Sequence, residues 1–240
     1  IKVPNEGTYT IDPNSGEVTF TPEPNFTGRG TGVTVQRVDK NGTPAESTYT
    51  PTVVGVTPKG EDVKSKDLQG ETQTGKPTFT GGKTTVNGKE ETVPMDDTVP
   101  ATFEDGSTTK VVPNEGTYTV EPDGTVTFVP EPKFTGVAKG VEVVRQDKNG
   151  TPAKATYTPE VKPVKPTGTD AVTEDVQGAT QTGKPVFQGG TAMVNGEEKT
   201  VEIDDTVPAK LVDPKTGDKV DSLTVEGEGT YTVAPDGTVT

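Results

Sequence analysis

The chain has 240 residues, of which 27% are hydrophobic, a formal net charge of −14, and neither cysteine nor histidine. The lack of cysteine excludes disulfides and thiol chemistry, and the lack of histidine removes the usual neutral-pH base and the commonest transition-metal ligand. The acidic balance argues against nucleic acid, whose phosphates need clustered Lys and Arg, and no apolar run is long enough to span a membrane.

A repeat of 108 residues organises the chain. Residues 20–28 return as residues 128–136, and residues 39–45 return as residues 147–153. Shorter blocks recur at the same offset, at Gln73–Pro77 and Gln181–Pro185 and at Asp96–Ala101 and Asp204–Ala209. A near-copied unit of this size predicts a tandem-repeat protein.

Two stretches that are rich in proline and glycine indicate where each repeat begins and ends. The stretches 53–60 and 161–168 are rich in Pro and Gly without an alternating pattern, which predicts two semi-rigid linkers. They enclose one complete repeat at residues 59–160, between the C-terminal part of a repeat (1–52) and the N-terminal part of a third (167–240). Because the sequence begins and ends inside a repeat, we expect it to be a window on a longer protein.

Within a repeat, every local signal predicts β-structure. In chain order, hairpin turns are predicted at Asn87-Gly88, at Pro122-Asp123-Gly124 and at Asn149-Gly150, because Asn and Gly tolerate the positive φ of tight turns. The flanking segments alternate Val, Tyr or Phe with Thr, as half-buried strands do. No window has helical spacing. The sequence therefore predicts an all-β fold of tandem, small β-sandwich-like repeat domains of about 100 residues, joined by Pro/Gly-rich linkers.

The strand-like positions of the complete repeat predict a small core. Its expected members are Val63, Leu68, Phe79, Val86, Val93, Phe103, Val111, Tyr118, Val120, Val126, Phe128, Phe134, Val141, Val143 and Tyr157.

The best candidates for a metal site are paired acids. Asp96-Asp97 and Asp204-Asp205 recur in two copies, and calcium takes oxygen ligands from loops. Two adjacent carboxylates fall short of the six to eight oxygens such a site needs, so we expect solvated positions at the start of a strand. Asp39-Lys-Asn-Gly42 lacks the later acidic ligands of a calcium loop, and a hairpin turn explains it better.

The residues give little support for an isopeptide crosslink, a proline-rich ligand or a glycosidase active site. A Lys–Asn isopeptide crosslink needs a buried Lys–Glu–Asn trio, and no position stands out as one. Phe20–Pro24 and Phe128–Pro132 lack PxxP spacing, so we expect strands ending in proline-locked loops. A carboxylate-only glycosidase needs two acids at a defined separation in a cleft. We therefore expect no enzyme, no cofactor, and no catalytic, cofactor-binding or metal-binding residues.

Many short blocks in a fixed order carry a family resemblance. Residues 73–79, 96–110, 116–128 and 147–152 follow one another as in the CshA-type fibril repeat of streptococcal and related Gram-positive surface adhesins, which the whole chain resembles. The third copy departs from the pattern at residues 210–217, which puts its local strand in doubt.

This resemblance implies a secreted protein that is covalently attached to the cell wall. Its all-β repeats would form a fibril that holds a distal binding region away from the cell, so the partners would be neighbouring repeats, with host or microbial ligands bound by other regions. We expect a monomeric stalk segment that binds no nucleic acid and does not insert into membranes. The alternative is that each repeat itself binds a ligand weakly and multivalently.

Overall fold

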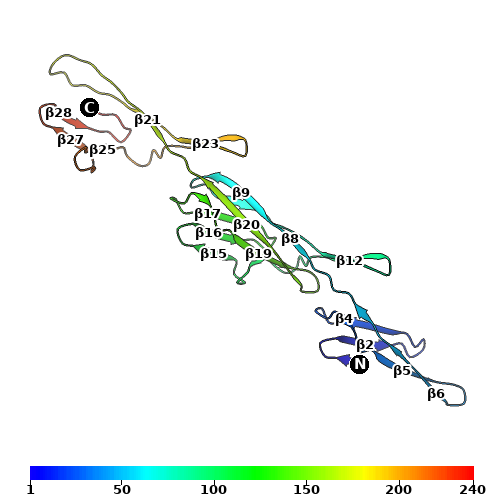
Figure 1. The fold of residues 1–240 in the computed structure, drawn as a ribbon. Helices are drawn as coiled ribbons and strands as arrows, with labels where there is room; N and C mark the ends of the chain where they lie inside the picture. The colour runs from blue at the N-terminus through cyan, green and yellow to red at the C-terminus, as the bar shows by residue number, and fades with distance from the viewer. The chain divides into compact units, whose positions relative to one another are not determined.

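The computed structural model describes all residues, 1–240, and contains 28 strands and no helix (Figure 1). This confirms the predicted all-β class. No segment of the structure is a helix that could cross a membrane. The chain divides into two compact units, which are Ile1–Ser65 with Thr72–Glu131 and Val137–Glu160, and Lys66–Glu71 with Pro132–Gly136 and Val161–Thr240.

The complete repeat, residues 59–160, contains two main sheets. The first has the order β10-β17-β16-β15, and the second has the order β14-β19-β20-β18, with β9 also pairing β20. The strands of these sheets are β9 (Val63–Leu68), β10 (Gln73–Gly75), β14 (Thr102–Phe103), β15 (Thr109–Val112), β16 (Gly116–Val120), β17 (Val126–Pro130), β18 (Gly136–Val137), β19 (Val141–Gln146) and β20 (Pro152–Lys162). β20 continues two residues into the range predicted as a linker.

Two smaller pairs complete this repeat. β8 (Lys59–Glu61) pairs with β11 (Thr78–Thr80), and β12 (Gly82–Val86) pairs with β13 (Lys89–Val93). The predicted turn between β12 and β13 is confirmed, because Asn87 and Gly88 have φ of 51° and 81°, the left-handed values that a two-residue hairpin turn requires.

The core lies between the two main sheets. Residues alternate between buried and less buried along β16, β17 and β19, so each strand turns one face inward. The rings of Tyr118 on β16 and Tyr157 on β20 meet edge to face, with centroids 6.4 Å apart, and so join the two sheets. This arrangement is the sandwich expected from the sequence.

The predicted hairpins around this core have the expected registers. Tyr118 lies opposite Phe128, and Val120 opposite Val126, across β16 and β17. β17 ends at Pro130, so the strand ends in a proline loop as predicted. Pairing between β19 and β20 places Val143 opposite Ala155, across the turn at Asn149-Gly150.

Most of the expected large core residues are buried, with one clear error. Leu68, Phe103, Tyr118, Val120, Val126, Phe128, Val141, Val143 and Tyr157 are buried, whereas Val63, Phe79, Val86, Val93 and Phe134 are half-buried. Val111 is 66% exposed, so its assignment to the core was wrong. It lies on the edge strand β15 opposite Thr117, on the face of the sheet that alternates with that of Tyr118.

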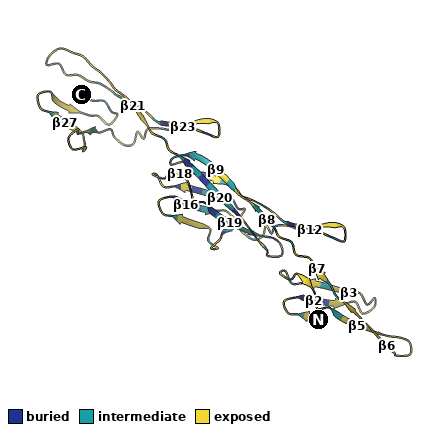
Figure 2. Ribbon diagram, viewed as in Figure 1, coloured by how far each residue is buried: buried dark blue, intermediate teal, exposed yellow.

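Residues 1–53, the back half-repeat, reproduce the later strands of the complete repeat. β1 to β3 form one sheet in chain order, β5 pairs with β6, and β4 pairs with β7. These strands are β1 (Lys2–Val3), β2 (Gly7–Ile11), β3 (Val18–Pro22), β4 (Gly28–Arg29), β5 (Val33–Val38), β6 (Pro44–Tyr49) and β7 (Thr52–Val53). No strands within residues 1–53 correspond to β8–β14. The ribbon in Figure 2 accordingly shows most of its buried positions in the complete repeat.

The third copy consists of two-stranded sheets only. Its pairs are β21 (Thr167–Thr169) with β22 (Val186–Gln188), β23 (Gly190–Val194) with β24 (Glu197–Val201), β25 (Leu211–Val212) with β26 (Lys219–Val220), and β27 (Ser222–Val225) with β28 (Gly229–Thr232). Val194 is its one buried large hydrophobic residue, at 1% exposure. The strand that the sequence placed in doubt is present here as the short β25.

Candidate functional site

The paired aspartates accept hydrogen bonds within turns, and one of them forms an ion pair. Asp96 Oδ1 accepts hydrogen bonds from Thr98 N at 3.0 Å and Thr98 Oγ1 at 2.7 Å, and these bonds hold the pKa of Asp96 below its usual value. Asp97 Oδ1 lies 2.8 Å from Arg145 Nη2. Asp204 accepts the same pair of bonds from Thr206. No group of three or more acidic, His or Cys side chains is placed to hold a metal ion.

The sequence Asp-Lys-Asn-Gly forms the predicted hairpin turn in both copies. Asp39 Oδ1 accepts from Asn41 N at 2.8 Å and from Thr43 N at 2.9 Å. Asp147 accepts the equivalent bonds from Asn149 N and Thr151 N. These bonds satisfy backbone donors of the turn, which is the role that aspartate has in Asx-turns.

A buried Glu–Tyr pair recurs that the sequence analysis did not single out. In the complete repeat, Tyr118 Oη donates to Glu115 Oε1 at 2.6 Å, and Lys139 N donates to Glu115 Oε2 at 2.9 Å. Both Glu115 and Tyr118 are buried, and burial together with the Glu115 bond raises the pKa of Tyr118. The pair therefore ties β16 to the loop that leads into β19.

The back half-repeat keeps this pair. Tyr9 Oη donates to Glu6 Oε1, and Glu6 Oε2 accepts from Thr31 N at 2.8 Å and from Thr31 Oγ1 at 2.7 Å. These bonds lower the pKa of Glu6, with the Tyr9 bond the largest cause. The signal that could have found the pair is the sequence Glu-Gly-Thr-Tyr, which occurs at Glu6, Glu115 and Glu228.

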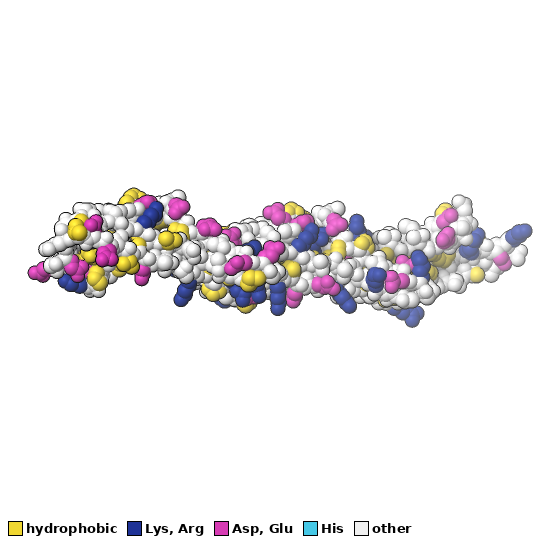
Figure 3. Space-filling view, turned by 90° about the horizontal axis from the view of Figure 1, so that it is seen from above, with side chains coloured by type: hydrophobic (Ala, Val, Ile, Leu, Met, Phe, Trp, Pro, Cys, Tyr) yellow, Lys and Arg dark blue, Asp and Glu magenta, His cyan; other side chains and the backbone are white.

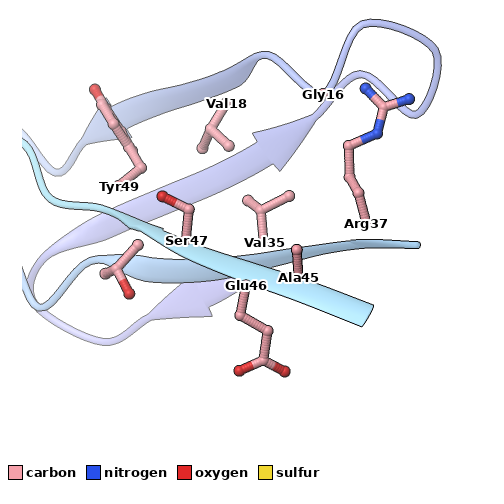
Figure 4. A pocket seen from close by; sticks show the side chains of 9 residues that line it. Gly16, Val18, Val35, Arg37, Ala45, Glu46, Ser47 and Tyr49 are labelled. Carbon is pink, nitrogen blue, oxygen red and sulfur yellow. The ribbon is translucent and has the colours of Figure 1, made fainter. Parts of the chain in front are cut away.

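The back half-repeat contains an open cleft. It has a volume of about 480 Å³ and is lined by Gly16, Val18, Val35, Arg37, Ala45, Glu46, Ser47, Thr48 and Tyr49. Figure 4 shows Val18 and Val35 pointing toward one another from facing strands, with Glu46 turned away. Apolar side chains of β3, β5 and β6 therefore line a space that is open to solvent.

The cleft corresponds to the sandwich interior of the complete repeat. The counterparts of Val18, Val35, Ala45, Ser47 and Tyr49 are Val126, Val143, Ala153, Ala155 and Tyr157, and all five are at most 4% exposed. Tyr49 itself is 40% exposed. The difference arises because β10 pairs with β17, and β14 with β19, in the complete repeat, whereas residues 1–53 contain no equivalent of β10 or β14.

Charged side chains of both signs share the surface. On the face shown in Figure 3, Lys and Arg lie among Asp and Glu along the whole chain rather than in a separate basic area. Several of them form exposed pairs, such as Lys76 with Asp123 at 2.7 Å and Lys184 with Asp236 at 2.7 Å. This face therefore shows no separate basic patch of the kind that phosphate binding needs.

The chain is built of strands alone, in tandem copies of one unit, and the complete copy forms a sandwich. These features define the class of all-β repeat proteins. A family described as "Surface adhesin CshA repetitive domain" matches residues 1–53, 55–161 and 163–240. The chain therefore belongs to the CshA adhesin repeat family, as the resemblance in its sequence predicted.

Two solved structures are similar to the chain. The NMR structure of repeat domain 13 of the fibrillar adhesin CshA from Streptococcus gordonii is 60% identical, over 28% of this chain and 86% of that one, with a TM-score of 0.18. A crystal structure of the N-terminal eight Ig domains of Down Syndrome Cell Adhesion Molecule isoform 1.30.30 is similar at 14% identity, over 88% of this chain and 30% of that one, with a TM-score of 0.34. The latter likeness is too distant to bear on function. A comparison with curated proteins finds no match.

Proposed function

We propose that the chain is a stalk segment of a surface adhesin that is covalently attached to the cell wall, and that it extends a distal binding region away from the cell. The observation that carries this proposal is the tandem array itself, because family matches cover the chain end to end. The complete repeat buries its own large side chains between its main sheets, among them Tyr118, Phe128 and Tyr157. A stalk needs such self-contained units.

The proposed division into units is that of the sequence. One complete repeat (59–160) lies between a C-terminal part (1–52) and an N-terminal part (167–240), with linkers at 53–60 and 161–168. In support, the family matches break at residues 54 and 162, at the beginnings of these two linkers. We also infer that the chain has no catalytic activity, since Asp96 and Asp204 accept hydrogen bonds within turns and Asp97 forms an ion pair with Arg145.

Small-angle scattering tests the stalk directly. A compact globule of 240 residues has a radius of gyration of about 18 Å by size scaling, and a row of separate units must exceed this clearly. A value near 18 Å would contradict the proposal. The measurement is made on dilute protein, so that association between copies does not raise the radius.

The alternative function is weak, multivalent ligand binding by each repeat. Aromatic residues make up 5% of the chain. In the complete repeat, Phe103, Tyr118, Phe128 and Tyr157 are buried, and Phe79 and Phe134 are half-buried. We therefore favour the structural role. A pull-down of host and microbial surface components with the chain itself separates the two, because a pure stalk retains none of them.

A further inference from the structure

A two-stranded hairpin comes after each predicted linker, and we call these two hairpins the arms (Figure 1). The first arm is β12–β13, residues 82–93, and the second arm is β23–β24, residues 190–201. Along β12 and β23, every second residue is buried or half-buried, and the residues between them are exposed. Each arm therefore has one covered face, although it pairs with no third strand. The covered face consists of Gly82, Thr84 and Val86 in the first arm and of Gly190, Ala192 and Val194 in the second.

One valine shows how closely the second arm is covered. Val194 on β23 is 1% exposed, whereas its neighbour Met193, on the opposite face, is 59% exposed. Two strands alone cannot enclose a side chain that projects from one face, so another part of the chain covers Val194. The second arm belongs to the same compact unit as residues 66–71 and 132–136 of the complete repeat. We call these two segments the linker-side end of that repeat.

An ion pair joins the second arm to the linker-side end. Lys199 Nζ on β24 lies 2.7 Å from Asp67 Oδ2 on β9, and the Asp67 side chain is 18% exposed. Lys199 lies opposite Ala192 in the hairpin, so it shares the covered face with Ala192 and Val194. The covered face of an arm in one repeat thus contacts a residue of the repeat before it.

Hydrogen bonds hold the linker-side end together where the linker begins. Gln69 donates from its backbone N to Lys162 O at 2.9 Å and from Nε2 to Pro132 O at 2.8 Å. A groove at this place is lined by Gln69 and Pro132 of the complete repeat, by Val164 of the linker and by Gly190 of the second arm, among others. The end of one repeat, the linker and the next arm therefore meet at one place.

Glycine allows each arm to lie against its linker. A Cβ on Gly190 would lie 2.7 Å from Lys165 N, and a Cβ on Gly82 would lie 2.7 Å from Thr57 N and 2.8 Å from Val56 Cβ. Both glycines are buried and neither has a positive φ, so the lack of space, and not the backbone conformation, requires glycine. Gly82 and Gly190 are 108 residues apart, as are Thr57 and Lys165, so the same close contact recurs at both linkers.

We propose that each arm is a docking surface whose partner is the repeat before it in the same chain. Its covered face binds the linker and the linker-side end of that repeat, and so fixes the joint between neighbouring repeats. This inference deepens the proposed stalk function and rests on it, because a fixed joint resists bending only where repeats follow one another. Proline stiffens each linker along its own length, and the arm holds the linker from the side.

Two neighbouring residues of β23 give a matched test on the 240-residue chain. Val194→Asp places a charge on the covered face, and Met193→Asp places the same charge on the exposed face. The measurement is the NMR order parameter of the Val164 and Lys165 amides. Val194→Asp is expected to lower it from about 0.85, the value of rigid backbone, to below about 0.6, and Met193→Asp is expected to leave it unchanged. A linker that is already mobile in the unaltered chain, or that stays rigid in Val194→Asp, would overturn docking.

A second pair of variants keeps the test valid even if Val194→Asp unfolds its own hairpin. Gly190→Val and Gly82→Val each place a side chain against one linker, and valine suits a strand. Gly190→Val is expected to lower the order parameters of residues 164–165 alone, and Gly82→Val those of residues 56–57 alone, so each variant is the control for the other. If neither linker responded, or both responded to either variant, the pairing of each arm with the linker before it would be wrong.

Scattering on the same samples separates this proposal from the stalk function. A radius of gyration well above about 18 Å together with mobile linkers would keep the stalk and overturn docking. A radius near 18 Å would contradict the stalk, and the order parameters decide docking in either case. The result expected from both proposals is an extended chain whose linkers are rigid and become mobile one at a time in the glycine variants.

Discussion

The complete repeat and the back half-repeat contain the same later strands, but only one of them encloses its apolar face. Tyr9 and Tyr118 are both buried, at 3% and 0% exposure, and each donates a hydrogen bond to a glutamate of its own segment. Tyr157 is also fully buried, whereas its counterpart Tyr49 is 40% exposed. The comparison shows that the Glu–Tyr pair organises its region locally, whereas the hairpin that carries Tyr49 depends on strands from the front of a repeat.

The largest effect is expected from truncating matched phenylalanines. Phe128 is fully buried, with its ring 4.5 Å from that of Tyr118, so Phe128→Ala should destabilise the complete repeat by about 3–5 kcal/mol. Phe20→Ala should cost less than half of this, because Phe20 is only half-buried although it contacts Tyr9 at the same distance. Urea unfolding followed by tyrosine fluorescence measures both. Equal losses of unfolding free energy in the two variants would contradict the difference in packing between the two regions.

The next effect concerns the Glu–Tyr pair. Glu115→Gln should destabilise the complete repeat by about 1–3 kcal/mol, because a buried carboxylate that accepts two hydrogen bonds is replaced by an amide with one acceptor oxygen. Glu131→Gln is the control, since Glu131 is exposed and accepts one bond from Asn114 N. The two variants are compared by thermal unfolding. A Glu115→Gln protein as stable as the control would show that the pair does not support the fold.

Alkaline pH should loosen the complete repeat through its buried tyrosines. Burial is the largest cause that raises the pKa of Tyr118 and of Tyr157 above the ordinary value of 10.0. Because the folded-state pKa exceeds the unfolded one, the stabilisation is complete below pH 10 and is lost as the pH rises above that value. Absorbance of tyrosinate followed together with circular dichroism checks this. Ionisation of all five tyrosines near pH 10 without loss of structure would contradict it.

The smallest effect is expected at an ion pair in the second compact unit. Lys199 Nζ lies 2.7 Å from Asp67 Oδ2, which raises the pKa of Lys199, and the lysine side chain is 42% exposed. Lys199→Ala should therefore have the smallest effect on stability of the changes considered, and a smaller one still in high salt. Lys215→Ala, at an exposed loop position, is the control. Amide exchange of residues 161–168 is the measurement, and a large loss of protection in Lys199→Ala but not in the control would show that this contact fixes the linker.

Local patterns in the sequence predicted most of the fold. The three hairpin turns, the alternating strands and the paired aromatic positions followed from residue chemistry that acts over a few positions. The small buried residues Ala101, Ala153 and Ala155 were not predicted, because alanine carries little hydrophobic signal and is buried here by the strands packed on it. Val111 was misplaced because alternation alone does not tell which face of an edge strand is covered.

The candidate sites were harder to predict than the fold. The turn roles of Asp39 and Asp147 followed from their motif, but Glu115 looks like any surface glutamate until the fold places Tyr118 and Lys139 N against it. The open cleft has no sequence signature, since its residues match those of the complete repeat. What distinguishes it is the absence of covering strands, and that is visible only in three dimensions.

Amide hydrogen exchange of β5–β6 against β19–β20, in one sample of dilute chain, tests the central comparison most directly. Slow exchange in β19–β20 and much faster exchange at equivalent positions of β5–β6 is the predicted result, because only the former pair is covered. Equal protection of the two hairpins at a concentration where sedimentation shows single chains would contradict the account.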